Sequence, residues 1–232
     1  MPGARQDPAM QLKEYPDAEM MMMDIADLLA SELRSTLSGH DHASLAVPGG
    51  TTPGPIFDAL CGAPLDWSRV HVMLTDERWV PEDSPRSNTR LLRDRLLREA
   101  AAAARLVPLY LPAETPEDRL EEIAEGLRPE LPLSVLLLGM GADMHTASIF
   151  PGADRLEDAL NGADLVVPMR APGAPEPRVT LTARVLREAM STHIVIKGAE
   201  KREALERARH LKPEEAPVAA VLRRATVHWA ED

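Results

Sequence analysis

The sequence predicts an α/β protein with a mostly parallel sheet and helices on both faces. Short apolar runs rich in Val, Leu and Ile recur along the chain, which is typical of strands that are buried on both sides. Longer segments with helical patterning separate these runs, and strands separated by helices pair in parallel through right-handed crossovers. In addition, polar and glycine-rich motifs directly follow three of the runs. Ligands of open α/β sheets bind beyond the carboxyl ends of the strands, so these motifs are the first candidates for a site.

Strands and helices are expected to alternate along the whole chain. We expect buried strands at residues 44–47, 70–74, 135–138, 193–196 and 226–229. We expect helices at residues 17–37, 55–60, 88–104, 116–127, 183–190 and 200–210. The Pro- and Gly-rich stretches 111–116 and 171–177 are expected to be surface loops, and neither is long enough to link two domains. We therefore expect a single domain over residues 1–232, in which residues 1–12 form a flexible N-terminal segment.

Composition excludes several classes of function. The formal net charge of −11 argues against nucleic acid or an anionic membrane as the main partner. The single cysteine, Cys61, excludes a disulfide within the chain, and its apolar neighbours predict a buried thiol. No His/Cys cluster has zinc-ligand spacing, and no apolar stretch reaches the roughly 18 residues that span a membrane. The N-terminus lacks a signal-peptide pattern, so we expect a cytoplasmic protein.

The first motif lies directly after the expected strand at 135–138. Gly139 and Gly141 allow a sharp turn, and Asp143 and His145 then follow two positions apart. Histidine exchanges protons near neutral pH, so this segment places a candidate general base at the end of a strand. An ordinary loop, in which the Asp caps a helix and the His is merely exposed, would produce the same pattern.

The second motif, residues 48–54, follows the expected strand at 44–47. Gly49 and Gly50 allow close backbone approach to an anion, and Thr51 and Thr52 offer hydroxyl groups and possible N-caps. Pro53 suits the first turn of a helix. The pattern predicts a helix N-terminus that faces a phosphate, although a simple strand-to-helix turn remains the alternative. It matches neither a dinucleotide-binding fingerprint nor a P-loop.

The third motif, residues 75–81, follows the expected strand at 70–74, and Asn88 lies shortly after it. Arg78 could hold a phosphate or carboxylate with its planar guanidinium. Asp76 could act as a base or hold Arg78 in place. A salt-bridged surface loop is the alternative interpretation.

Together these segments resemble the glucosamine-6-phosphate isomerase/6-phosphogluconolactonase family, and the lactonases in particular. The similar segments are Gly-Gly-Thr-Thr-Pro at 49–53, Asp-Glu-Arg at 76–78 with Ser-Asn at 87–88, Gly-x-Gly-x-Asp-x-His-Thr-Ala-Ser-x-Phe-Pro-Gly at 139–152, Pro-Arg-Val-Thr at 177–180 and Gly-x-x-Lys at 198–201. They occur in order over most of the chain. The resemblance implies a glucosamine-6-phosphate isomerase-like fold, a modified Rossmann-like arrangement, for one lactonase domain. It also implies a cytoplasmic hydrolase of the pentose phosphate pathway that needs no metal and no organic cofactor.

The resemblance implies that His145 is catalytic, that Asp143 supports it, and that Arg78, Arg178 and Lys201 lie near a phosphate. With the motif reasoning, the expected substrate- or phosphate-binding residues are Gly49, Gly50, Thr51, Thr52, Asp76, Arg78, Asn88, Arg178 and Lys201. The implied reaction is hydrolysis of 6-phospho-D-glucono-1,5-lactone to 6-phospho-D-gluconate by water that His145 activates. The expected partner is this small sugar-phosphate lactone, and the expected state is a monomer or weak dimer.

One position departs from the family pattern. The family usually has Gly between the Asp and the His, where this chain has Met144. A positive φ there would cost on the order of 1–2 kcal/mol for a non-Gly residue. Because bulky residues seldom adopt that conformation, we expect an ordinary backbone at Met144.

Two other functions remain open. A sugar-phosphate isomerase or deaminase of the glucosamine-6-phosphate type usually has Asp-Glu-Tyr in place of Asp-Glu-Arg, and a Glu soon after the catalytic His. Here Arg78 occupies the first place, and residues 146–150 contain no carboxylate, so both differences favour the lactonase. A non-catalytic sugar-phosphate sensor would need a further module. The remaining histidines in expected strands, His71, His193 and His228, are interpreted as packing residues rather than ligands.

Overall fold

A seven-stranded parallel sheet forms the centre of the computed structural model, which describes residues 9–232. All of its neighbouring strands pair in parallel, so the expected α/β class is confirmed. In spatial order the strands are β1 (Gln11–Glu14), β10 (Thr226–Ala230), β9 (Ser191–Lys197), β6 (Val135–Leu138), β2 (Ala43–Val47), β3 (Val70–Leu74) and β5 (Arg105–Leu106). Strands β2 and β6 are buried along their whole length, as their mostly apolar sequences predict.

The direction of chain progress reverses at the centre of this sheet. From β2 the chain runs outward through β3 to β5, and it then returns to place β6 on the other side of β2, followed by β9 and β10. The pair β2–β6 is therefore the topological switch point, where ligands of such sheets bind beyond the carboxyl ends. The loops after β2 and β6 are the first two motifs of the sequence.

A second, three-stranded antiparallel sheet was not expected from the sequence. It consists of β4 (Asp76–Arg78), β8 (Arg178–Leu181) and β7 (Val166–Met169), with β8 in the middle. Only Thr75 separates β3 from β4, and it joins the two sheets: its amide donates to Val47 of β2, and its carbonyl accepts from Leu181 of β8. The third motif, for which a surface loop was the alternative interpretation, therefore contains a short strand.

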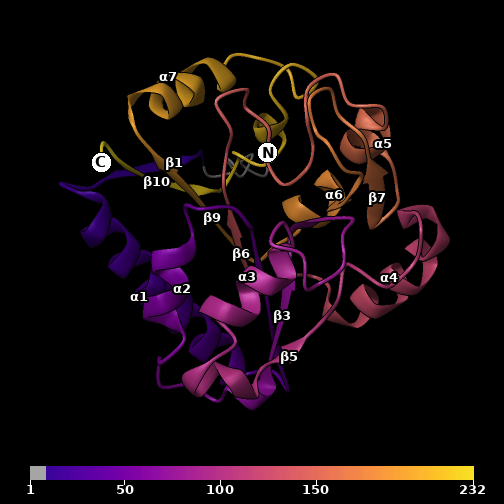
Figure 1. Ribbon diagram of the computed structural model, residues 1–232. Coiled ribbons are helices and arrows are strands. Elements are labelled where there is room, and N and C mark those ends of the chain that lie inside the picture. Colours follow the sequence, from indigo (N-terminus) through magenta and orange to yellow (C-terminus); the bar gives the residue numbers. More distant parts are fainter. Residues whose placement is uncertain (1–8) are drawn as a thin grey trace, which may run out of the picture.

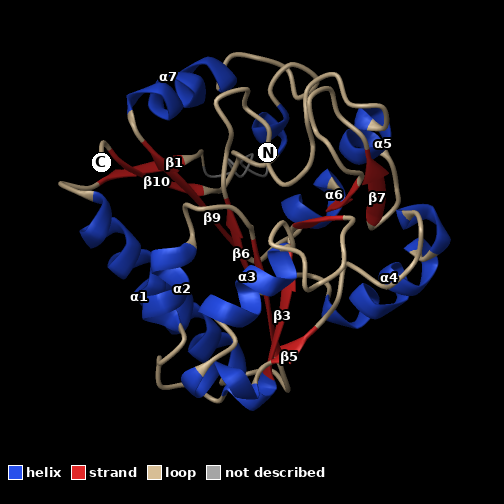
Figure 2. Cartoon of the chain, in the orientation of Figure 1, coloured by secondary structure: helices blue, strands red, loops and turns tan. Residues whose placement is uncertain are grey.

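The helices are α1 (Ala18–Leu37), α2 (Gly54–Leu60), α3 (Asn88–Arg95), α4 (Leu120–Leu127), α5 (Leu156–Asn161), α6 (Ala183–Arg187) and α7 (Ala199–Ala208). Figure 1 shows α1 and α2 on one side of the central strands and α4 and α6 on the other. Figure 2 shows how much of the chain between these elements is loop. In the described part of the chain, no helix is long and apolar enough to cross a membrane.

Helix α1 illustrates how local sequence determines where a helix begins and which of its faces is buried. Asp17 caps its first turn by accepting a hydrogen bond from the Met20 amide at 2.8 Å. Its buried residues recur at helical spacing along one face, from Met21 to Leu37. Of the four consecutive methionines, Met21 and Met22 are buried, whereas Met20 and Met23 are exposed. Cys61 is buried, as expected. The loop expected at 171–177 is confirmed, and so is the loop expected at 111–116 except for its last residue, Pro116, which begins a 3₁₀ turn.

Several expected boundaries were wrong. The helix expected at 88–104 ends at Arg95, and a separate 3₁₀ turn (Glu99–Ala103) follows; Glu99 has a φ of +50°, which a continuous right-handed helix cannot contain. The helix expected at 183–190 ends at Arg187. The helix expected to begin at 116 is a 3₁₀ turn (Pro116–Asp118) before α4. Helix α5 and strands β1, β5, β7 and β8 were not expected.

The flexible N-terminal segment was expected to extend to residue 12, and this boundary was wrong. Residues 1–8 lie outside the described residues, but Gln11 and Leu12 belong to β1, which pairs in parallel with β10 at the sheet edge. The Gln11 amide donates to the Ala225 carbonyl at 2.9 Å. Backbone pairing, which needs no strong side-chain pattern, therefore holds this part of the chain.

Two strand histidines take part in a buried polar chain rather than in apolar packing alone. The His193 and His228 rings are hydrogen-bonded at 2.9 Å, His228 also contacts the Tyr15 hydroxyl, and His193 contacts Glu32. Burial, followed by the neighbouring His193, lowers the pKa of His228 to about 3, so this ring is neutral at physiological pH. The interpretation of these residues as packing residues was therefore incomplete.

Candidate functional site

A cleft of about 250 Å³ opens at the carboxyl ends of β2, β6 and β9. The motif after β2, the turn after β6, the small antiparallel sheet and the start of α7 all contribute to its wall. Every residue expected at the site lines this cleft except Asp143. The lining residues expected from the sequence are Gly49, Gly50, Thr51, Thr52, Asp76, Arg78, Asn88, His145, Arg178 and Lys201. The topological switch point thus brings residues of all three motifs together in one cleft.

The imidazole of His145 is held by Asp143 within a tight turn after β6. The His145 Nδ1 and Asp143 Oδ1 atoms are 2.5 Å apart, and the same oxygen accepts the His145 amide at 3.1 Å. A Cβ atom on Gly141 would lie 2.2 Å from His145 Nδ1 and 2.6 Å from Asp143 Oδ1, so this arrangement requires glycine at 141. Asp143 therefore supports the imidazole from outside the cleft.

The electrostatics of the pair favour a charged Asp143. Burial alone raises the pKa of Asp143, but hydrogen bonds from the His145 ring and amide outweigh it, so the pKa lies below its usual value. A carboxylate at Nδ1 favours the tautomer with the proton on Nδ1. Nε2 of His145 then carries the lone pair that can accept a proton.

Met144 has a φ of +68°, so our expectation of an ordinary backbone at this position was wrong. The surrounding turn imposes the conformation: the Met144 amide donates to the Gly141 carbonyl at 2.9 Å, and its carbonyl accepts from Val218 at 3.0 Å. The Met144 side chain packs against the core while remaining partly exposed. These contacts offset the strain, which is on the order of 1–2 kcal/mol for a non-Gly residue.

Two arginines lie side by side on neighbouring strands of the small sheet. Arg78 of β4 is the register partner of Arg178 of β8, and both guanidinium groups form ion pairs with Glu176. The Nε atoms of both arginines are buried and have no hydrogen-bond partner within residues 9–232. Burial lowers the pKa of Arg178 below its usual value, although Asp76 opposes this. Two adjacent cations with free donors form a site that favours an anion.

Arg178 is also linked to the imidazole through an aromatic ring. Its guanidinium lies over Phe150 at 5.3 Å from the ring centroid, and the Phe150 and His145 centroids are 4.4 Å apart. The expected cation and the expected base therefore share one wall of the cleft.

Asp76 is fully engaged in hydrogen bonds rather than free to act as a base. Its carboxylate accepts from the Ser148 hydroxyl at 2.5 Å and from the Thr75 hydroxyl at 2.8 Å, and the residue is buried. The sequence left open a role as a base or as a group that holds Arg78 in place. The geometry argues against the base, and the charge of Asp76 acts on Arg178, the neighbour of Arg78 in the small sheet.

The loop after β2 approaches Asn88 without side chains between them. A Cβ atom on Gly49 would lie 2.1 Å from Asn88 Oδ1, and Gly50 has a φ of +83°. Thr51 and Thr52 do not cap α2: Pro53 occupies the N-cap position, and the helix has no side-chain cap.

On the opposite side of the cleft, Lys201 donates to the Met140 carbonyl at 2.5 Å, next to the turn that holds His145.

Sequence reasoning missed Glu77, a buried carboxylate behind the cleft wall. It accepts hydrogen bonds from the amides of Arg78, Asn88 and Thr89, the last two in the first turn of α3. Burial raises the pKa of Glu77, and these hydrogen bonds oppose the rise. Glu77 thereby fixes Arg78 and Asn88 relative to each other. Its position inside the Asp-Glu-Arg motif, followed by a helix start at Ser87, was the available signal.

Comparison with known proteins gives a consistent result. Residues 16–229 match the family model described as glucosamine-6-phosphate isomerases/6-phosphogluconolactonase. The chain is 44% identical to the 6-phosphogluconolactonase of Rhizobium meliloti, covering 95% of this chain and 98% of that protein, and 42% identical to that of Mesorhizobium japonicum, covering 93% of each. A crystal structure of a 6-phosphogluconolactonase from Shewanella baltica superposes with a TM-score of 0.93 at 32% identity, covering 95% of this chain and 97% of that one.

Proposed function

Since this chain belongs to the glucosamine-6-phosphate isomerase/6-phosphogluconolactonase family, we propose that its cleft hydrolyses 6-phospho-D-glucono-1,5-lactone to 6-phospho-D-gluconate. The enzyme is thus a carboxylic ester hydrolase of the oxidative pentose phosphate pathway. One observation supports the proposal at this site: His145 lines the same cleft as Arg78 and Arg178, whose buried Nε atoms make no hydrogen bond within residues 9–232. A proton acceptor and a pair of cations in one cleft suit a substrate that carries both a lactone and a phosphate.

The proposed reaction uses His145 as both base and acid. Nε2 removes a proton from a water molecule while the water oxygen attacks C1 of the lactone. When the C1–O5 bond breaks, the same Nε2 returns the proton to the ring oxygen, which becomes a free hydroxyl group. The carboxylic acid formed at C1 then releases its own proton to water and gives the carboxylate. Asp143 holds the ring by its 2.5 Å contact at Nδ1 and stabilises the imidazolium that forms between the two transfers.

The phosphate serves as a handle that positions C1. Arg78 and Arg178 are the main proposed phosphate ligands because their Nε donors have no other hydrogen-bond partner in the described residues. Lys201 joins them by exchanging its contact with the Met140 carbonyl for the phosphate. Gly49, Gly50, Thr51, Thr52 and Asn88 form the facing wall and contact the polyhydroxyl part of the substrate, while Asp76 holds Ser148 and supports the arginines. Fixing a bound substrate in this way supplies the positional part of the rate enhancement.

An assay with freshly prepared 6-phosphogluconolactone tests this function. Product formation is followed by coupled oxidation of 6-phosphogluconate, and the spontaneous hydrolysis rate is subtracted. We expect enzyme-dependent hydrolysis of this lactone and no release of ammonia from glucosamine 6-phosphate. Ammonia release without lactone hydrolysis would favour the isomerase or deaminase function, and binding of the sugar phosphate without either reaction would favour a sensor.

We further propose a cytoplasmic enzyme that acts as a monomer or weak dimer, without a nucleic-acid or membrane partner. The net charge of −11 supports the exclusion of polyanionic partners. Light scattering at two protein concentrations tests the oligomeric state.

A further inference from the structure

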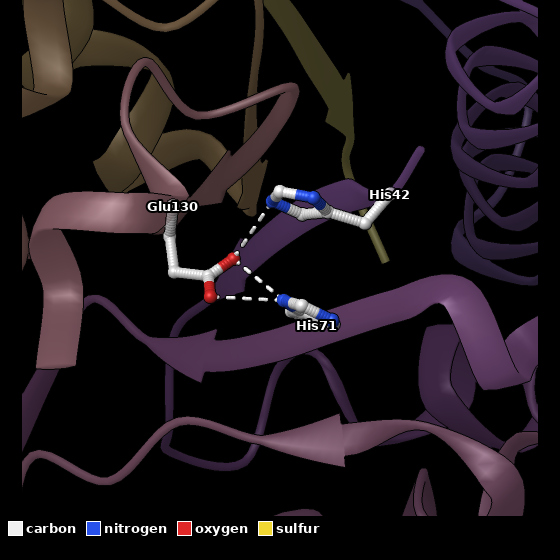
Figure 3. A group of neighbouring side chains, drawn as sticks. All are labelled: His42, His71 and Glu130. Carbon is white, nitrogen blue, oxygen red and sulfur yellow. Dashed lines mark hydrogen bonds and ion pairs between the residues drawn. The ribbon is translucent and has the colours of Figure 1, made fainter. Parts of the chain in front are cut away.

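A second group of ionisable side chains lies at the amino-terminal edge of the parallel sheet, opposite the cleft. His42 directly precedes β2, His71 is the second residue of β3, and Glu130 ends a 3₁₀ turn (Arg128–Glu130) before β6. Figure 3 shows both imidazole rings directed at the carboxylate of Glu130. These residues come from three segments that are far apart in the sequence, which is why a search for local ligand spacing did not detect them.

The strand register brings the two histidines together. Ser44 of β2 pairs with His71 of β3, and His42 lies two residues before Ser44. Alternate residues of a strand point to the same face, so His42, Ser44 and His71 share one face. The His42 and His71 rings stack with centroids 4.4 Å apart and an interplanar angle of 17°.

Glu130 is held against this face by Ser44. The Ser44 hydroxyl donates to the Glu130 carbonyl at 2.9 Å, and the Ser44 amide and hydroxyl also bond to Ser134. The Glu130 side chain is 2% exposed, whereas that of His42 is 36% exposed. Ser44 therefore holds the backbone of Glu130, the Glu130 carboxylate is buried, and the cluster opens to solvent on the His42 side.

The distances between the ligand atoms suit one small cation. Zn–N and Zn–O bonds are about 2.0–2.2 Å, so two ligand atoms on a tetrahedral ion lie roughly 3.3–3.5 Å apart. His42 Nε2 is 3.3 Å from Glu130 Oε2, and His71 Nδ1 is 2.8 Å from the same oxygen. All three residues have ligand atoms within 4.8 Å of one another. For one ion to take all three ligand atoms, the His71–Glu130 separation must widen by about half an ångström and the two stacked rings must tilt, because a ring nitrogen binds a metal in the plane of its own ring.

We propose that His42, His71 and Glu130 bind one divalent transition-metal ion at the edge of the sheet opposite the cleft. Two imidazoles and a carboxylate favour ions of the Zn²⁺ type over Mg²⁺ or Ca²⁺, which prefer oxygen ligands. Water completes the coordination on the exposed side next to His42. The ion joins the starts of β2 and β3 to the turn that leads into β6 and therefore stabilises the fold; it takes no part in lactone hydrolysis.

Calorimetric titration of chelator-treated protein with ZnCl₂ tests the proposal, followed by absorption spectra with Co²⁺. We expect one saturable site in the wild type and at least about tenfold weaker binding in His42→Ala and in Glu130→Gln. His42→Ala is the key variant because its side chain is partly exposed and its removal leaves the His71–Glu130 contact intact. A thermal melt in EDTA shows whether each variant is folded before its binding is compared.

Two matched controls locate the ion. His40→Ala removes a nearby exposed histidine whose ring contacts only the Thr36 carbonyl among the hydrogen bonds of the described residues, and it should bind Zn²⁺ like the wild type. His145→Asn removes the histidine of the cleft and should also retain the site. The proposal is overturned if the wild type shows no saturable binding at micromolar Zn²⁺, or if His42→Ala binds as tightly as the wild type. Loss of binding in His145→Asn alone would place the ion in the cleft and would also overturn it.

Discussion

Two histidine–carboxylate pairs lie at opposite edges of the same sheet. They contain the same two kinds of functional group but differ in the origin of their residues, in exposure and in their surroundings. At the carboxyl edge, His145 and Asp143 belong to one turn, are 2.5 Å apart, and the Asp143 side chain is 54% exposed. At the amino edge, His71 and Glu130 come from separate elements, are 2.8 Å apart, and the Glu130 side chain is 2% exposed. His145 lines a cleft together with two arginines whose Nε atoms make no hydrogen bond in the described residues, whereas His71 is stacked against the His42 ring.

The comparison shows that the pair itself does not define a catalytic site. A carboxylate that orients an imidazole becomes useful for hydrolysis when the second ring nitrogen can reach a substrate and when other groups hold that substrate. Only the pair at the switch point meets both conditions among the described residues. The buried pair instead connects strands and is expected to act on stability.

The largest expected effect is the loss of catalysis on replacing the histidine of the cleft. His145→Asn should lower enzyme-dependent lactone hydrolysis by roughly 10²–10⁴-fold, the contribution of a general base, while the protein remains folded. His71→Asn is the matched substitution at the other edge and should leave turnover per folded molecule close to that of the wild type. Similar losses in both variants would show that the two pairs do not differ as described.

The next effect concerns the anion site that distinguishes the cleft. Arg78→Ala or Lys201→Ala should weaken binding of 6-phosphogluconate by roughly 1.5–3 kcal/mol, the scale of a charged hydrogen bond. Calorimetry with the product measures this loss directly. Gluconate without the phosphate should bind weakly to all three proteins, and an equal loss of its binding in the variants would indicate a structural role for these cations.

The buried pair should matter more for stability than the exposed one. Glu130→Gln removes the acceptor of a buried contact and should lower the free energy of unfolding by roughly 1–3 kcal/mol. Asp143→Asn, at an exposed pair, should change it by less than about 1 kcal/mol. Urea unfolding in the presence of EDTA compares the two, and the reverse order would contradict the assignment of a structural role to the amino edge.

The smallest effect lies in the backbone beside His145. Because Met144 has a φ of +68°, Met144→Gly should relieve strain and raise the free energy of unfolding by up to about 1 kcal/mol, after allowing for the greater freedom of glycine in the unfolded chain. Met144→Asn is the control, because asparagine tolerates a positive φ but does not give the unfolded chain the extra freedom that glycine does. A clear fall in melting temperature in both variants would show that packing of the Met144 side chain outweighs the strain.

The sequence predicted the parts of the molecule that depend on local patterns. Mostly apolar runs located β2, β3 and β6, and helical patterning located α1. Motifs directly after strands predicted the residues of the cleft, because the carboxyl ends of parallel strands meet at one edge. These signals are carried by consecutive residues.

What could not be predicted depends on contacts between distant segments. The short strands β4 and β8 exist because their backbones pair with each other, which brings Arg78 beside Arg178 across about a hundred residues of sequence. The cluster of His42, His71 and Glu130 likewise arises only from strand register. At Met144, the hydrogen bonds of the turn that holds His145 override the usual preference of the residue.

The most direct test of the central claim is to measure kcat/KM for 6-phosphogluconolactone and for unphosphorylated gluconolactone side by side in the wild type, His145→Asn and Arg78→Ala. If one cleft combines a general base with a separate phosphate site, His145→Asn should reduce hydrolysis of both lactones by similar factors. Arg78→Ala should reduce hydrolysis of the phosphorylated lactone alone and leave the slow hydrolysis of the other nearly unchanged. Near-normal hydrolysis by His145→Asn, or an equal loss on both lactones in Arg78→Ala, would contradict this division of roles.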